Sequence, residues 1–375
     1  MKNKKILIEF HGWKPNHYSD KILLTALKKK FNSKIDIEAY STDQFFFEKN
    51  IIKKLLDKAK FFFGQVFSIK TFGFYKSELA VDKIFFPNVC KKHKIKSLKY
   101  CNKFFKKKIS KKKILNLKIN QIFIGDVIYD SYIRSYNKAT VDYYDNNFIS
   151  FFKNFLSLFY FWEDYFKVNQ IKAVISHHNT YLPGIPARIA IFKNIKCLTD
   201  QDFKLYQLTK KNLKAGLQFR NYKKNFRKFN KLLQKKAIKR ANLDLIKKFD
   251  GDTKHEYYML KSSFSKIKFK KRFIKKNNNF KILILPLSFY DSPSGYGGCL
   301  FNDFYEWLNF VLKLSKKTDY DWYIKLHPDV LLKWDYLNYE TVLELLKKYE
   351  NVKWIPPEVS HNQIIKEGIN AALTI

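Results

Sequence analysis

The sequence is poor in cysteine, and its four cysteines, Cys90, Cys101, Cys197 and Cys299, are scattered along the chain. They form no C-x-x-C pair, and no histidine stands at an offset typical of zinc sites. The sequence therefore indicates neither a disulfide framework nor a structural metal.

Acidic residues are also scarce, because 33 Asp and Glu stand against 73 Lys and Arg, a formal net charge of +40. Such a charge attracts polyanions such as nucleic acid, anionic lipid or acidic glycans. The excess is mostly lysine and accompanies abundant Asn, Ile, Phe and Tyr, a mixture typical of an AT-rich genome whatever the protein does. Since clustering on one face, not total charge, marks a nucleic-acid footprint, we expect no nucleic-acid partner.

Long apolar runs are missing as well. The run Ile6–Phe10 is too short for the apolar core of a secretory signal. The longest apolar region, Phe148–Trp162, is interrupted by Lys153 and Asn154 and is shorter than the ~20 residues of a spanning helix. We therefore expect a cytoplasmic chain in which this region either buries one face or rests on the inner face of the membrane.

The hydrophobic content of 46% over 375 residues is enough for two folded domains. A strand over 6–10, a helix over 20–31 and a strand over 35–40 form a βαβ unit, which predicts a parallel sheet. The pattern continues with strands over 121–124 and 171–176 and helices over 146–168 and 185–192. The sequence therefore predicts an α/β, Rossmann-like first domain over 1–260.

This first domain ends in a basic region, 203–248, with a helical pattern. The run 261–279 contains no acidic residue and is interpreted as a linker or exposed crossing loop. A second α/β domain over 280–375 then begins. Its strands are expected over 280–286, 322–326, 352–354 and 371–375, and its helices over 302–315, 339–349 and 361–367. Because the chain stops at a core strand, this domain is expected to be incomplete and the natural chain to continue.

The most informative motif is the end of the strand over 322–326, where Lys325, His327 and Pro328 follow a short apolar run. Ligands of α/β folds bind outside the carboxyl ends of strands, so this basic pair suits a diphosphate. Pro328 fixes its own φ and holds His327 in an extended conformation. An ordinary strand end remains the alternative.

A polar, glycine-rich loop over 288–298 follows the first strand of the second domain. Its backbone N–H groups and hydroxyls could contact phosphate, although such clusters are also ordinary loop chemistry. Together with the basic pair, the loop predicts a nucleotide site in which Lys325 neutralises phosphate charge and His327 bonds or protonates the leaving phosphate. The loop residues assigned to phosphate binding are Ser292, Ser294, Gly295, Tyr296 and Gly297, with the Gly295–Gly298 backbone as donor.

Polar side chains also follow three strands of the first domain and could supply the general base for an acceptor hydroxyl. Asp126 and His177 are the best candidates, although a loop cap or a satisfied polar contact is the more ordinary role for each. The further acceptor-side candidates are His11, Asp130, His178 and Asn179. The remaining histidines, His17, His93, His255 and His361, show no partner pattern and are interpreted as surface or packing residues.

These motifs resemble the capsule and surface polysaccharide biosynthesis glycosyltransferases of GT-B architecture, a group that includes CMP-Kdo-using capsule transferases. The resemblance extends over most of 120–375. It is carried by 291–298, Trp307 and 322–328, with weaker support from 125–134 and 176–188. The His-Pro element is also similar to that of capsule sialyltransferases and of CDP-glycerol glycerophosphotransferases.

The resemblance implies two Rossmann-like domains facing a cleft and transfer of a sugar from a nucleotide donor, CMP-Kdo-like or other, to a lipid-linked or growing glycan. It implies no cofactor and no bound metal. In that family a small-residue loop that helps hold the donor phosphates follows the strand matching 371–375. Two alternatives stay open: a CDP-glycerol-type glycerophosphotransferase, and a non-catalytic basic protein that binds nucleic acid or a membrane.

Overall fold

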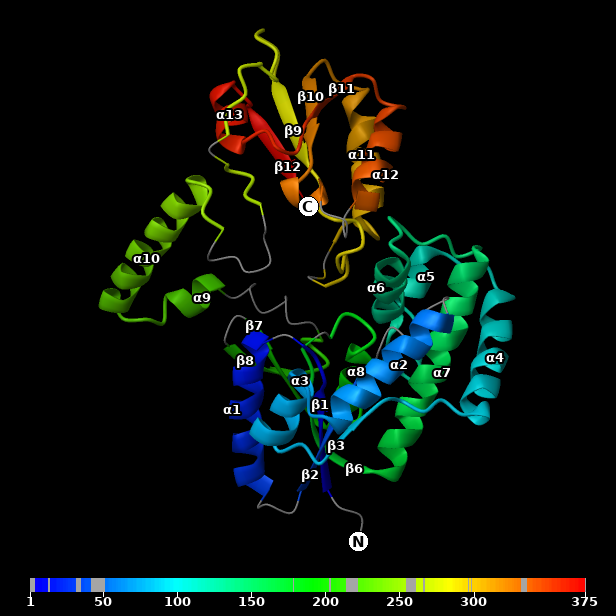
Figure 1. Cartoon of the computed structure of the whole chain (residues 1–375). Helices are drawn as coiled ribbons and strands as arrows, with labels where there is room; N and C mark the ends of the chain where they lie inside the picture. Colours follow the sequence, from blue (N-terminus) through cyan, green and yellow to red (C-terminus); the bar gives the residue numbers. More distant parts are fainter. Residues whose placement is uncertain are drawn as a thin grey trace. The chain divides into compact units, whose positions relative to one another are not determined.

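The computed structural model describes residues 4–12, 14–31, 35–41, 51–177, 179–201, 204–213, 222–253, 261–265, 267–295, 297, 299–331 and 336–374. The chain divides into two compact units (Figure 1). The first unit comprises residues 1–136, 141–218 and 294–298, and the second comprises 137–140, 219–293 and 299–375. Each unit is built on its own parallel or mostly parallel sheet, which confirms the α/β prediction.

The first unit contains a six-stranded sheet in the order β3-β2-β1-β6-β7-β8. Four of the neighbouring strand pairs are parallel, and β8 pairs antiparallel with β7. The strands are β1 (Lys4–Glu9), β2 (Ile35–Tyr40), β3 (Lys83–Phe85), β6 (Gln170–Ile175), β7 (Lys196–Gln201) and β8 (Lys204–Leu208). Strand β8 corrects the expectation of helix at the start of the region 203–248, because Lys204–Leu208 pairs with residues 197–201 of β7.

The first unit's helices begin with α1 (Lys14–Phe31), which connects β1 to β2 and packs Leu23, Leu24 and Leu27 on the sheet. The predicted helix over 20–31 is thus confirmed and begins six residues earlier. The other helical elements are α2 (Ile51–Val66), α3 (Thr71–Gly73), η2 (Phe74–Glu78), α4 (Lys91–Phe105), α5 (Lys111–Leu115), α6 (Gly125–Tyr136), α7 (Asn146–Val168) and α8 (Gly184–Phe192).

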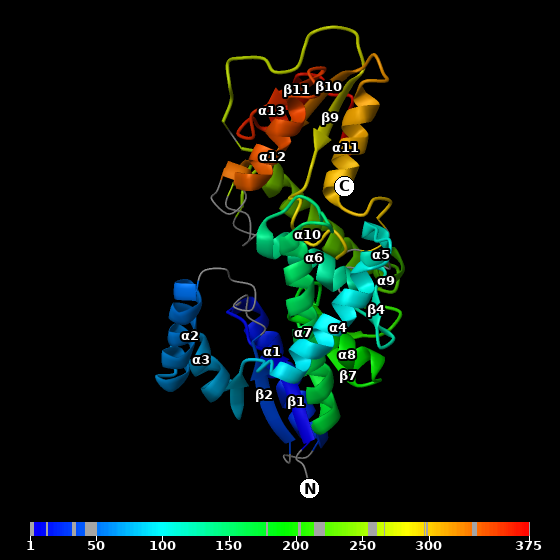
Figure 2. The ribbon, with the colours of Figure 1, turned by 90° about the vertical axis from the view of Figure 1, so that its right-hand side faces the viewer.

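The apolar region over 148–162 lies in α7 and is buried inside the protein. Asp145 caps this helix by accepting a hydrogen bond from the Asn147 N–H at 2.8 Å. The helix runs beside α4 (Figure 2), and the rings of Phe104 and Phe152 stack with centroids 5.0 Å apart. Aromatic residues at helical spacing therefore form core here, which decides between the two roles left open for this region.

The expected strand over 121–124 lies outside the main sheet of the first unit. It forms only the two-residue β5 (Ile122–Phe123), paired antiparallel with β4 (Lys118–Ile119). Asn120 and Gln121 have φ values of 49° and 66°. Consecutive positive φ values belong to tight hairpin turns, so the chain reverses here instead of continuing as a long strand.

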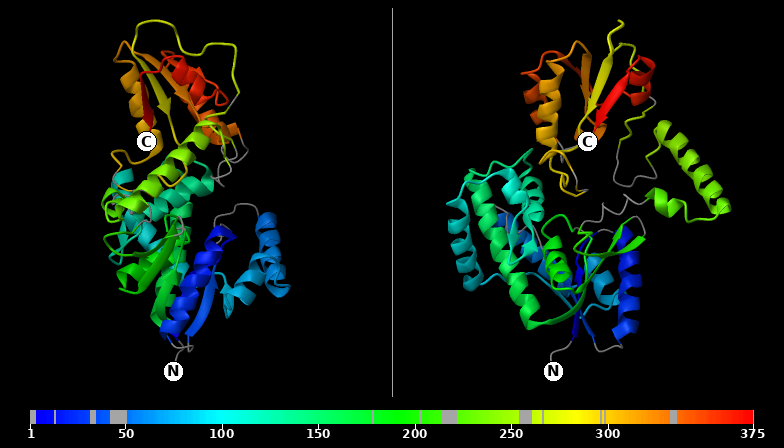
Figure 3. Two further views of the ribbon diagram at one scale, coloured as in Figure 1. Left: turned by 90° about the vertical axis from the view of Figure 1, so that its left-hand side faces the viewer. Right: turned by 180° about the vertical axis from the view of Figure 1, so that it is seen from behind.

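The second unit contains a four-stranded parallel sheet in the order β11-β10-β9-β12 (Figure 3). Its strands confirm the predicted ranges closely: β9 (Lys281–Leu285), β10 (Asp321–Lys325), β11 (Val352–Ile355) and β12 (Ala371–Thr374). The helical elements are α9 (Tyr222–Phe226), α10 (Lys231–Phe249), α11 (Phe304–Ser315), η4 (Pro328–Leu331), α12 (Tyr336–Leu346) and α13 (His361–Lys366).

The acid-free segment 267–279 lies along this second unit. Ile274 is buried and packs with Leu283 and Tyr323. The Glu367 carboxylate accepts hydrogen bonds of 2.8 Å from the backbone N–H groups of both Phe273 and Ile274. This segment is thus attached to the core of the second unit by packing and by backbone hydrogen bonds.

Among the helices within the described ranges, none combines the length and the apolar character needed to cross a bilayer.

Candidate functional site

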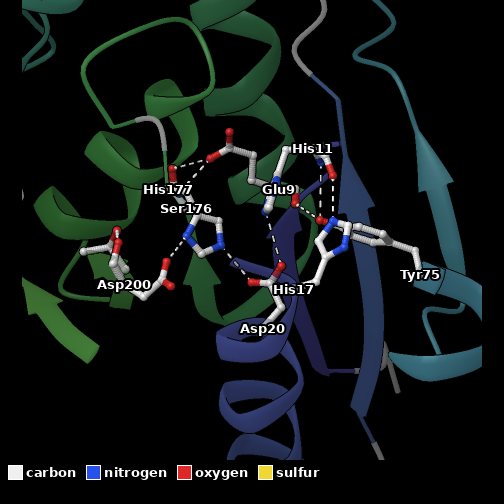
Figure 4. Close-up of polar contacts among 9 residues, drawn as sticks. Glu9, His11, His17, Asp20, Tyr75, Ser176, His177 and Asp200 are labelled. Carbon is white, nitrogen blue, oxygen red and sulfur yellow. Dashed lines mark hydrogen bonds and ion pairs between the residues drawn. The ribbon is translucent and has the colours of Figure 1, made fainter. Parts of the chain in front are cut away.

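The first unit gathers His11, Asp20 and His177 in one buried cluster (Figure 4). Strands β1 and β6 are paired neighbours, so the residues that follow their carboxyl ends lie side by side. Asp20 reaches them from α1. Its Oδ1 lies 2.7 Å from His177 Nε2 and its Oδ2 lies 3.3 Å from His11 Nε2.

Asp200, in β7, contacts the other ring nitrogen of His177. His177 Nδ1 pairs with the Asp200 carboxylate while Nε2 pairs with Asp20, so carboxylates flank the imidazole on both sides (Figure 4). Burial by itself would lower the pKa of His177, but the hydrogen bonds with Asp20 and Asp200 raise it to about 10. Burial opposes ionisation of Asp20, yet its hydrogen bonds with His11 and His177 lower its pKa.

The backbone around this cluster is braced by Glu9 and Tyr75. The Glu9 carboxylate accepts hydrogen bonds from the His177 N–H at 2.7 Å and from Ser176 Oγ at 3.2 Å. Tyr75 donates its hydroxyl proton to the Glu9 carbonyl at 2.7 Å and accepts from the His11 N–H at 3.3 Å. These contacts hold the backbone at His11 and His177, from which the two side chains enter the cluster.

The sequence predicts a surface or packing role for His17. Its side chain packs against Phe74 and also contacts His11 of the cluster. Its ring stacks on Phe74 with centroids 4.3 Å apart, and its Nε2 lies 3.1 Å from the His11 carbonyl. Burial lowers the pKa of His17. Sequence reasoning missed Asp20 and Asp200 altogether, since one lies inside a helix and the other inside a strand with no motif around it.

The cluster lies deep in the unit, because the side chains of His11, Asp20, His177 and Asp200 are 7%, 0%, 2% and 3% exposed. A saccharide hydroxyl would need an exposed ring nitrogen to transfer its proton. The arrangement suits a proton or a small ion better than a large substrate.

The other acceptor-side candidates have separate surroundings. Asp126 Oδ2 pairs with Arg188 Nη2 at 2.7 Å, which favours a structural role. Asp130 is buried and accepts a long hydrogen bond, 3.4 Å, from the Ser294 N–H. Asn179 is buried beside the start of α8, and His178 lies outside the described residues.

In the second unit, Lys325 ends β10 with a fully buried side chain. Its Nζ donates to the Leu326 carbonyl at 3.2 Å. Within the described ranges no carboxylate forms an ion pair with this ammonium group. Burial lowers the pKa of Lys325 to about 8, and the nearby charge of Glu358 offsets only part of this shift.

His327 lies just beyond Lys325, with one third of its side chain exposed. The Asp329 N–H donates to His327 Nδ1 at 3.2 Å, so the neutral ring carries its proton on Nε2. Burial, followed by the charges of Lys325 and His327, lowers the pKa of His361 to about 3. His361 thus lies partly buried close to Lys325 and His327, a proximity that its sequence context did not indicate. Pro328 begins η4 directly after His327.

The glycine-rich loop is described only in part, since Tyr296 and Gly298 lie outside the described residues. Ser292 and Gly297 have positive φ values of 49° and 65°. Ser292 belongs to the second unit, whereas Ser294, Gly295 and Gly297 belong to the first. The backbone of this loop is therefore turned sharply at two of the predicted phosphate-binding positions.

Comparison with known proteins gives no match among family models, curated proteins or solved structures.

Proposed function

We propose that this protein is a glycosyltransferase that moves a sugar from a nucleotide donor to a surface glycan or its lipid-linked precursor. The observation that carries the proposal is the buried ammonium group of Lys325 at the carboxyl end of a central parallel strand. A buried ammonium group with one carbonyl partner retains donors that an anion would satisfy. Donor phosphates are anions that characteristically bind at this edge of such sheets.

The positions of Lys325 and His327 support a different role for each side chain. Lys325 neutralises charge on the donor phosphates, and His327 Nε2–H donates a hydrogen bond to the phosphate oxygen that leaves. The bond between the sugar anomeric carbon and that oxygen breaks, and a bond to the acceptor oxygen forms. The acceptor hydroxyl loses its proton to a base. The net charge of +40 suits an anionic acceptor.

The test is calorimetric titration of CMP, CDP and UDP into the protein and into Lys325→Met and His327→Ala. Loss of a charge-assisted contact to phosphate should weaken binding at least about tenfold in each variant. Lys347→Met, an exposed position on the second unit, is the matched control and should bind as the wild type does. Absence of binding to all three nucleotides, or equal binding by every variant, would refute the proposal.

A further inference from the structure

We infer that His11, Asp20 and His177 bind one divalent metal cation of the zinc class. The inference is independent of the proposed transferase activity and departs from the sequence-based expectation of no bound metal. Two imidazole nitrogens and a carboxylate form a ligand set that zinc and neighbouring transition metals favour. The three come from the end of β1, from α1 and from the end of β6, so an ion would link three elements of the fold.

The spacing of the ligand atoms suits a metal. Within this group they all lie within 4.8 Å of one another. Metal bonds of about 2.0–2.1 Å place the ligands of a tetrahedral ion about 3.4 Å apart. His11 Nε2 and Asp20 Oδ2 are 3.3 Å apart, close to this spacing. The distance between His177 Nε2 and Asp20 Oδ1 is 2.7 Å and would have to lengthen slightly on metal binding.

Charge balance supports the same conclusion. Asp20 and Asp200 are both buried, and no lysine or arginine in the described part of the chain pairs with either one. Two buried carboxylates that share a single imidazolium remain incompletely balanced, which is costly. A divalent cation with two neutral imidazoles would balance these two charges fully, whereas one imidazolium balances only half of them.

Asp200 completes the arrangement by its contact with His177 Nδ1. Metal-binding histidines usually donate their second ring N–H to a carboxylate, which orients the ring and makes the binding nitrogen more basic. With Nε2 directed at Asp20 and Nδ1 at Asp200, His177 has the geometry of such a ligand (Figure 4).

The experiment is metal binding by the full chain after removal of bound ions with a chelator. Zn²⁺ and Mn²⁺ are titrated separately by calorimetry, and retained metal is counted by elemental analysis after dialysis. We expect one equivalent of Zn²⁺ per chain. Asp20→Asn and His11→Gln should each bind at least tenfold more weakly, and Asp200→Asn should lose 10- to 100-fold in affinity, as second-sphere carboxylate changes do.

His93→Gln is the matched control, because His93 is a buried histidine of the same unit that contacts Asp164 and not this cluster. It should bind Zn²⁺ as the wild type does. If Asp20→Asn does not fold, His11→Gln and the visible spectrum of the Co²⁺-loaded wild type carry the test, since tetrahedral nitrogen and oxygen ligation gives strong absorption bands. No stoichiometric binding, or equal binding by the wild type and His11→Gln, would overturn the inference.

Discussion

Asp126 and Arg188 form an ion pair inside the first unit, with Asp126 Oδ2 accepting from Arg188 Nη2 at 2.7 Å. The guanidinium group is fully buried and also lies 5.5 Å from the centre of the Phe123 ring. The second carboxylate oxygen accepts from the Val127 N–H at 2.9 Å. The pair therefore joins α6 to α8, and its carboxylate is engaged on both oxygens.

Arg188→Met should lower the free energy of unfolding by about 3–5 kcal/mol, because it leaves the Asp126 charge buried without its partner. Urea denaturation followed by circular dichroism measures this change. The double variant Asp126→Asn with Arg188→Met should recover part of the loss, since it removes the orphaned charge. A loss under about 1 kcal/mol in the single variant would contradict a structural role for the pair.

Gly125 lies where α6 begins and allows close approach of the backbone from α5. A Cβ at this position would meet the Ile114 carbonyl oxygen at 2.0 Å and the Leu117 nitrogen at 2.6 Å. Gly125→Ala should therefore cost at least about 2 kcal/mol, since backbone atoms cannot move aside as a side chain can. Gly12→Ala is the control, because among the described residues its Cβ would meet only Thr71 Oγ1, at 3.9 Å. Similar melting temperatures for the two variants would argue against this packing.

Much of the fold could be predicted from hydrophobic pattern, because central parallel strands are short apolar runs bounded by polar residues. The central strands β9 and β10 follow this rule and lie within one residue of their predicted ranges. The edge strand β8 could not be predicted in this way. Within the described ranges it pairs along one edge with β7 alone, so no strong apolar pattern is required.

The candidate site was predictable only where side chains follow strand ends. His11, His177, Lys325 and His327 were found by this rule. Asp20 and Asp200 contact His177 from positions 157 and 23 residues away, and single-sequence patterns carry no information on such contacts. The role of each histidine depends on these partners, so sequence reasoning could place the residues without assigning their chemistry.

The four cysteines should separate into two reactive classes. Cys90 and Cys299 are exposed, whereas Cys101 and Cys197 are buried. Burial raises the pKa of Cys101 to about 11 and that of Cys197 to about 12, so little thiolate forms at neutral pH. Titration of the native protein with a thiol reagent should modify two thiols quickly and all four only after denaturation. Rapid modification of all four thiols without denaturant would contradict this burial pattern.

The buried ammonium group of Lys325 should destabilise the fold in the absence of a ligand. Its pKa is about 8 in the folded chain against an ordinary value of 10.5. Between these values the unfolded chain binds more protons, so the contribution of Lys325 to the free energy of unfolding rises as the pH increases from about 8 to 10.5. The full change is at most about 3 kcal/mol, and it should be absent in Lys325→Met.

Urea denaturation of the wild type and Lys325→Met at pH 7, 8, 9 and 10 measures this difference, since other titrating groups are shared. At pH 7 the methionine variant should be the more stable of the two, because a neutral side chain replaces a buried charge. The difference in free energy of unfolding between Lys325→Met and the wild type should decrease as the pH rises. A nucleotide whose phosphates pair with Lys325 should reduce this advantage of the methionine variant at pH 7, since the nucleotide binds more tightly to the chain that keeps the ammonium group and stabilises it more. A stability difference that stays constant with pH would show that Lys325 does not titrate in this range.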